Sequence, residues 1–155
     1  FAGIVQLYRD LIALRLDKHG VTAGLSGHGV EVHHVNHTDK VIAFHRWERG
    51  GPGDHTLIVL NFADRSYDEY LLGFPHDGVW RVRMNGDARV YDKEFGDFYC
   101  PDVTTSPVER DGLPFCGSVR LAPYGFLILS GDPPAPRAAR RARPTPVKPP
   151  VRLAD

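Results

Sequence analysis

The amino-acid sequence predicts a mainly β protein: an antiparallel β-sandwich, preceded by one amphipathic helix and followed by a disordered C-terminal tail. Two changes of pattern along the chain predict this. Apolar residues recur at helical spacing over residues 4–18, and after Gly29 they alternate with polar residues. From Asp132 onward Pro, Ala and Arg dominate, and no segment there could build a core.

The first element is a helix over residues 4–18, with Gly20 as a plausible stop. Its apolar residues form one broad stripe: Ile4, Leu7, Tyr8, Leu11, Leu14 and Leu16. A helix this apolar needs a surface to bury against.

Short segments rich in Val, Ile, Leu, Phe and Tyr then predict strands. They span residues 30–35, 40–47, 56–62, 69–74, 79–84, 118–121 and 124–130. Turn-forming residues separate them, and Asn85-Gly86 alone is typical of a tight hairpin. The connections are too short for parallel crossovers, so we expect mostly antiparallel pairing in a sandwich.

Residues 85–117 are the exception, because about thirty residues pass there without a strong strand pattern. This loop is rich in aromatic residues: Tyr91, Phe95, Phe98, Tyr99 and Phe115. We therefore expect it to pack against another surface. The tail, residues 132–155, is expected to be disordered and partly polyproline II.

Charge and composition argue against nucleic-acid and membrane partners. The chain of 155 residues has a net charge of zero, with a mildly acidic body and a basic tail. We interpret the tail as a solvated extension. No apolar run is long enough to span a membrane, and the amino end lacks the pattern of a signal peptide. Cys100 and Cys116 could form a disulfide, but reduced thiols in a cytoplasmic protein are the favoured interpretation.

The eight histidines invite a metal-site hypothesis, most of all the cluster His33, His34 and His37. Adjacent strand residues point to opposite faces, so His33 and His34 should not share one ion. His34 and His37 could approach through the turn, but no Cys or carboxylate is placed beside them. We expect exposed strand histidines, no metal site and no cofactor.

No catalytic residue is expected either. Glycoside chemistry needs two carboxylates about 5–10 Å apart, and nothing in the sequence pairs any two of the available ones. These are Asp64, Asp68, Glu69, Asp92, Glu94 and Asp97, all in turns and loops where acids are normally solvated. No G-x-S-x-G elbow is present, and the glycine-rich segment 24–29 is read as a flexible connection.

The two tryptophans, Trp47 and Trp80, offer rings that could stack on sugars, and alternation suggests that one of them is exposed. A lone Trp in a β-sandwich is more often part of the core or of a domain interface. Substrate-binding residues therefore stay undetermined from the sequence.

Four segments, in order, resemble the α-amylase clan. VQLYRDLIALR at residues 5–15 is similar to the last barrel helix of that clan, and KVIAFHRW at 40–47 with LIVLNFADRSYDEY at 57–70 resembles the start of its all-β C-terminal domain. LAPYGFLILS at 121–130 is similar to the closing strand. The segment 71–96 most resembles 1,4-α-glucan branching enzymes, through Gly73, Pro75, Gly78, Trp80, Asn85 and Asp87.

The resemblance implies a division of the chain into the last helix of a truncated (β/α)8 barrel (1–20), an all-β C-terminal sandwich domain (21–131) and a tail (132–155). The start at Phe1 fits such a truncation. It implies a non-catalytic domain of a cytoplasmic glycosyltransferase of glycogen biosynthesis, which meets α-glucan through the parent enzyme and stabilises the missing catalytic barrel. The catalytic carboxylates of the family lie on barrel loops, so none can be carried over to this chain.

Two other interpretations stay open. One is the C-domain of an α-amylase-type glucan hydrolase, because sandwiches of this type recur in the clan. The other is a stand-alone carbohydrate-binding module, which would bind glucan through Trp47 or Trp80.

Overall fold

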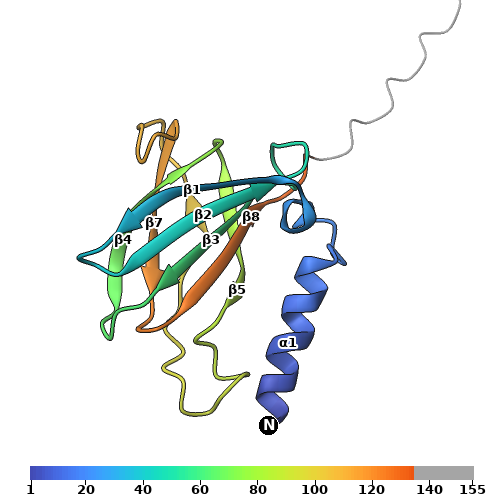
Figure 1. The fold of residues 1–155 in the computed structure, drawn as a ribbon, viewed down its shortest axis with the longest axis vertical. Helices are drawn as coiled ribbons and strands as arrows, with labels where there is room; N and C mark the ends of the chain where they lie inside the picture. The colour runs from blue at the N-terminus through green and yellow to red at the C-terminus, as the bar shows by residue number, and fades with distance from the viewer. Residues whose placement is uncertain (135–155) are drawn as a thin grey trace, which may run out of the picture.

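The computed structural model describes residues 1–134 (Figure 1). Its elements, in chain order, are helix α1 (Ala2–Arg15), the 3-10 helix η1 (Ala23–Ser26) and strands β1 (Gly29–Asn36), β2 (Val41–Trp47), β3 (Thr56–Asn61), β4 (Tyr67–Phe74), β5 (Val79–Asn85), β6 (Val103–Thr104), β7 (Phe115–Leu121) and β8 (Phe126–Gly131). No helix in this part of the chain is long and apolar enough to cross a membrane.

The strands form two sheets, and every strand pair is antiparallel. The larger sheet has the order β1-β2-β3-β8-β5-β6, and β4 pairs with β7 in the smaller one. The inner faces of the two sheets bury one common core. Its largest fully buried side chains include Trp80, Phe74, Leu57 and Leu72. The predicted antiparallel sandwich is therefore confirmed.

Helix α1 packs on the outer face of the larger sheet (Figure 1). Leu7, Leu11 and Leu14 lie against a second apolar cluster whose sheet residues include Ile58 and Ile128. Side chains of β3 and β8 are therefore buried on both faces of the sheet, in the sandwich core and under α1. This explains why the sequences of these strands are nearly continuous apolar runs.

The helix ends at Arg15, three residues before the predicted end. Asp17 and Gly20 have φ values of 50° and 67°, so the chain turns through left-handed backbone that a helix cannot hold. The buried Thr22 stabilises this end, because its hydroxyl donates a hydrogen bond to the carbonyl of Leu14 at 2.8 Å.

The Asn85-Gly86 pair does not form the predicted hairpin. β5 pairs with β6 and β8, and the chain after Asn85 enters a long loop instead. Side chains close this loop on itself: the Asn85 amide donates to the carbonyl of Phe98 at 2.8 Å, and the Asp87 carboxylate accepts from the Phe98 amide at 2.7 Å. A turn does close here, with the Ala88 amide donating to the Asn85 carbonyl at 3.3 Å, but the chain does not return as a strand paired across it.

The region 85–117 also contains more strand than predicted. β6 lies within it, and β7 begins at Phe115 rather than at residue 118. The Cys116–Gly117 segment carries few polar residues to alternate with apolar ones, which hid the start of β7. A disordered tail was predicted for residues 132–155, and all of it from residue 135 onward lies outside the described residues.

Candidate functional site

One side of helix α1 carries a stripe of large apolar side chains that nothing in the described chain covers. Ile4, Tyr8 and Ile12 recur every fourth residue and are 51%, 62% and 52% exposed. The opposite side of the same helix is already packed on the larger sheet. Other exposed apolar residues of this segment are Phe1, Val5 and Leu16.

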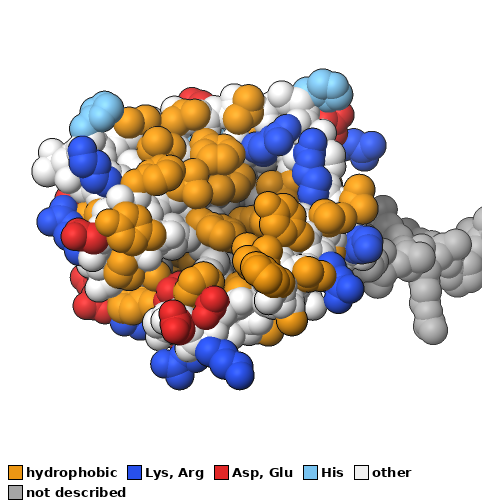
Figure 2. All heavy atoms as spheres, turned by 60° about the horizontal axis from the view of Figure 1, so that its bottom comes forward, with side chains coloured by type: hydrophobic (Ala, Val, Ile, Leu, Met, Phe, Trp, Pro, Cys, Tyr) orange, Lys and Arg blue, Asp and Glu red, His pale blue; other side chains and the backbone are white. Residues whose placement is uncertain are grey.

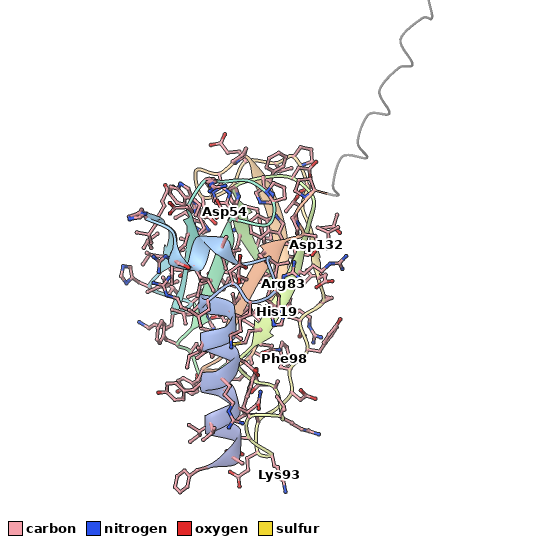
Figure 3. The ribbon with its side chains drawn as sticks, turned by 90° about the vertical axis from the view of Figure 1, so that its right-hand side faces the viewer. His19, Asp54, Arg83, Lys93, Phe98 and Asp132 are labelled. Atoms are coloured by element: carbon pink, nitrogen blue, oxygen red, sulfur yellow. The ribbon has the colours of Figure 1, made fainter. Side chains whose placement is uncertain are left out.

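The loop after β5 lies beside the N-terminal half of α1. The Tyr91 hydroxyl donates a hydrogen bond to Asp10 Oδ2 at 2.9 Å, and residues 1–4 and 89–94 together line an open hollow of about 720 Å³. Figure 3 shows Lys93 at the lower end of this loop, near the start of the helix. The predicted packing of the loop is seen for Tyr91, which contacts the cluster beneath α1, and for Phe115, which packs against the core. It is wrong for Phe95 and Tyr99, which are exposed.

The outer face of β1 adds a second set of exposed apolar residues, Val30, Val32 and Val35. In the antiparallel register Val32 lies opposite Phe44 and Val35 opposite Ile42, so all of them share the face on which α1 packs. Figure 2 shows apolar side chains gathered over the middle of one face of the molecule, with charged side chains toward its rim. We call the exposed stripe of α1, the loop 86–102 and the outer face of β1 the helix–loop face.

The β1 part of this face was missed in the sequence. The signal was the alternation of Val30 and Val32, read there only as evidence of a half-buried strand. Large exposed apolar patches of this kind mark surfaces that contact other protein.

The prediction that the strand histidines are exposed is wrong for His33 and His34. A β-bulge between Val32 and His34 interrupts the alternation, so both imidazoles point toward the sandwich interior. His34 lies 3.0 Å from Asp111 and 2.9 Å from the Tyr70 hydroxyl, whereas His33 faces His45. His37, in the turn that follows, is exposed as predicted.

The side chains of His33 and His34 therefore both point into the sandwich, but they contact different partners. Within residues 1–134, no group of three or more His, Cys, Asp or Glu side chains is arranged to hold a metal ion. His33 and His45 instead begin a row of rings that continues through His55 to His76 at one end of the sandwich. Burial lowers the pKa of all four, and brings those of His45 and His55 to about 4.

Neither tryptophan offers a free ring face for a sugar. Trp80 is completely buried, and its indole N–H donates to the carbonyl of His76. Trp47 is half-buried and stacks on His45, with ring centroids 4.9 Å apart. The expectation that one of the two is exposed is therefore wrong. Trp80 belongs to the core of the sandwich, and Trp47 packs against His45 at its edge.

The carboxylates considered for glycoside chemistry are all exposed, but Asp68 and Glu69 lie in β4 rather than in a turn or loop as predicted. Asp68 pairs with Arg120 at 2.7 Å, and Asp92 accepts a hydrogen bond from the backbone of Glu94. The glycine-rich segment 24–29 forms η1 and enters β1. Cys100 and Cys116 are buried free thiols, and burial raises the pKa of Cys100.

Comparison with known proteins matches residues 32–132 to the family described as "Alpha amylase, C-terminal all-beta domain". The relatives include the 1,4-alpha-glucan branching enzyme GlgB of Salinibacter ruber (strain DSM 13855 / M31), 37% identical over 79 residues, which are 50% of this chain and 12% of that protein. The GlgB of Rhodopirellula baltica (strain DSM 10527 / NCIMB 13988 / SH1) is 29% identical over 131 residues, 82% of this chain and 17% of that protein.

The GlgB of Mycobacterium sp. (strain KMS) is 32% identical over 91 residues, 58% of this chain and 12% of its own length. The chain thus spans less than a fifth of these curated relatives. The antiparallel sandwich and the family match agree over most of the chain: it belongs to the alpha-amylase C-terminal all-beta domain family.

Proposed function

We propose that this chain is the C-terminal, non-catalytic part of a 1,4-α-glucan branching enzyme, and that its helix–loop face packs against the catalytic barrel of the same polypeptide. In this proposal residues 1–20 supply the last barrel helix, residues 21–131 the supporting sandwich and residues 132–155 a tail. The parent enzyme would work in the cytoplasm on α-glucan, with no nucleic-acid partner.

The exposed stripe of α1 carries the proposal. One side of this helix is buried against a sheet and its other side is also apolar. This pattern is typical of a helix that lies between two layers of protein. Burying a side chain the size of Ile or Leu stabilises a fold by about 1.5–3 kcal/mol. Covering Ile4, Tyr8 and Ile12 would therefore contribute substantially to holding a barrel in place.

The role follows from this arrangement. Barrel enzymes carry their catalytic groups on loops at the carboxyl ends of the strands, while the helices form the outer ring. A sandwich attached to the last helix would stabilise the ring and leave the reacting groups to the barrel. No residue of this chain is assigned a chemical step.

The test is a double substitution, Ile4→Lys with Ile12→Lys, made both in the full-length enzyme and in the 155-residue chain. We expect the melting temperature of the full-length enzyme to fall by several degrees, because two charges would enter the interface. The 155-residue chain should keep its melting temperature, since both positions are exposed in it.

The matched control is Arg9→Ala, at an exposed polar position of the same helix, which should change neither protein. An unchanged full-length enzyme would overturn the proposed packing. Branching and hydrolysis are separated by the product: new α-1,6 linkages support the proposal, and a rise in reducing ends without them favours the hydrolase alternative. A native protein of about 17 kDa, detected with an antibody against residues 30–130, would overturn the attachment to a barrel.

A further inference from the structure

We propose that His33, His45, His55 and His76 form an acid-sensitive latch, which holds the loop between β2 and β3 closed over one end of the sandwich at neutral pH and releases it on acidification. This inference concerns a different end of the molecule from the helix–loop face and does not depend on the proposed function.

The four imidazoles form one continuous row that links four segments of the chain. Ring centroids are 5.2 Å apart between His33 and His45, 5.5 Å between His45 and His55, and 5.6 Å between His55 and His76. His33 belongs to β1, His45 to β2, His55 immediately precedes β3 and His76 lies in the turn before β5. Trp47 stacks on His45 within the row, and Trp80 stacks on His76 at one end of it.

Two hydrogen bonds of the row require neutral rings. The amide of Gly51 donates to His55 Nδ1 at 2.9 Å, so this nitrogen must carry a lone pair. The Nδ1 atoms of His33 and His45 face one another at 3.3 Å, so one of the two must accept. An imidazolium has no acceptor nitrogen, so protonating His55 breaks its hydrogen bond with the Gly51 amide.

Two further ring nitrogens offer no acceptor to an added proton. His33 Nε2 and His76 Nε2 are buried without a hydrogen-bond partner in the described chain. A buried N–H without an acceptor would be costly at either position. The row is thus built for neutral imidazoles at several independent points.

Acidic side chains surround the row but do not offset its burial. Glu31 of β1 lies 3.7 Å from His45 Nε2, and Asp111 acts on His33 from the loop before β7. Asp54 acts on His55 from the β2–β3 loop, and Asp77 on His76 from the turn before β5. His34 is the further neighbouring cation when protonated, and it opposes the charging of His33.

Each carboxylate raises the pKa of its neighbour, and burial is the larger effect in every case. The folded pKa of each histidine thus lies below its ordinary value near 6.5. The closed state then binds fewer protons than an open one. Its stability is complete above pH 6.5 and is lost as the pH falls from there toward 4, where His45 and His55 titrate.

The loop that the latch holds also contacts the end of the last strand. The amide of Gly53 donates to the carbonyl of Gly131 at 3.0 Å, and Gly53 approaches Pro133 so closely that a Cβ atom would lie 2.8 Å from its side chain. Figure 3 shows Asp54 in this loop, on the same end of the molecule as Asp132. Opening the loop would therefore release the segment in which the described chain ends.

The test follows two probes in the full 155-residue chain between pH 7.5 and 3.5: NMR titration of the histidine rings, and hydrogen exchange of the Gly51 amide corrected for its intrinsic rate. We expect the His55 ring to titrate well below 6.5, and the opening of Gly51 to increase roughly tenfold or more between pH 6.5 and 5, because the open state gains its proton before the closed state does. A His55 ring that titrates near 6.5 would overturn the latch, as would Gly51 exchange that stays constant while His55 becomes protonated.

A variant separates the latch from general acid unfolding. His55→Asn places an acceptor oxygen near the position of Nδ1 but does not titrate, so Gly51 should keep its protection at pH 5. The control is His37→Asn, at an exposed histidine outside the row, which should retain the full pH dependence. Equal pH dependence in both variants would overturn the assignment to His55, and the ring titration of the unmodified chain decides the matter if His55→Asn does not fold.

Discussion

Tyr91 and Asp10 join the long loop to the helix across 81 positions of the sequence. The Tyr91 hydroxyl donates to Asp10 Oδ2 at 2.9 Å, while its ring packs against the apolar cluster beneath α1. Burial, together with this hydrogen bond, raises the pKa of Tyr91 to about 12, so the phenol stays protonated as a donor. The helix and the loop are therefore one surface, and they should respond to substitution together.

Replacing Tyr91 with Phe removes this hydroxyl and keeps the ring. Asp10 would lose a donor at a partly buried position, so we expect the free energy of unfolding to fall by about 1 kcal/mol. Chemical denaturation measures this. The control Tyr99→Phe, at an exposed ring, should change it by less than about 0.5 kcal/mol. Equal effects from both variants would show that the bond to Asp10 does not hold the loop.

Gly3→Ala distinguishes helix propensity from packing. Ala is favoured over Gly inside a helix by about 1 kcal/mol, so propensity alone predicts a more stable protein. A Cβ atom at Gly3, however, would lie 1.7 Å from the carbonyl oxygen of Tyr91, which no side-chain motion can relieve. We expect a net loss of stability in thermal unfolding, with amide shifts over residues 89–94. A gain in stability would mean that the helix start is not seated on the loop.

Thr22 fixes the other end of the helix. Its buried hydroxyl donates to the Leu14 carbonyl, and its amide donates to Asp17 Oδ1 at 2.7 Å. Thr22→Val keeps the shape but removes this bond and leaves the Leu14 carbonyl with the Asp17 amide as its donor, so we expect a loss of about 1 kcal/mol in unfolding free energy. Thr38→Val, at an exposed threonine, is the matched control and should be nearly neutral. A neutral Thr22→Val would contradict this anchoring role.

The sandwich could be predicted because local patterns decide it. Residues such as Leu57 and Val59 alternate toward the core, and turn residues separate the strands, so element type and antiparallel pairing follow from short-range chemistry. The helix period over residues 4–18 predicted α1 for the same reason, although the helix begins two residues earlier and ends three residues earlier than predicted.

The candidate site could not be predicted in the same way, because it depends on exceptions to periodicity and on long-range contacts. The bulge after Val32 places both His33 and His34 on the inner face, and a single extra residue of this kind leaves no mark on composition. Asn85-Gly86 forms a turn but no hairpin, because the chain that follows is held by a bond from the Asn85 amide to the Phe98 carbonyl. The row of imidazoles joins segments up to 43 positions apart, from His33 to His76, which no local pattern links.

Asp132 offers the last test, because it pairs with two arginines of β5. Its carboxylate accepts from Arg81 at 2.6 Å and from Arg83 at 2.5 Å, and Figure 3 shows Arg83 and Asp132 near one another. The Arg81 bond first, and then the Arg83 bond, lower the pKa of Asp132 below its usual value. Its contribution to stability is therefore complete above the ordinary aspartate pKa of about 3.9, and it is lost as the pH falls below that value through the lowered pKa of the folded protein.

Because Asp132 is exposed, water and salt screen this contribution, and Asp132→Asn should cost less than about 1 kcal/mol at pH 7 and low salt. In 1 M NaCl the cost should shrink further, since the Debye length falls to about 3 Å. Denaturation of both proteins at the two salt concentrations measures the difference. Asp68→Asn, which removes the partner of Arg120 at a still more exposed position, is the matched control and should cost less. A loss at Asp132 of several kcal/mol that ignores salt would instead mean that Arg83, bonded also to Ser130 at 2.9 Å, is left as an unpaired charge inside the fold.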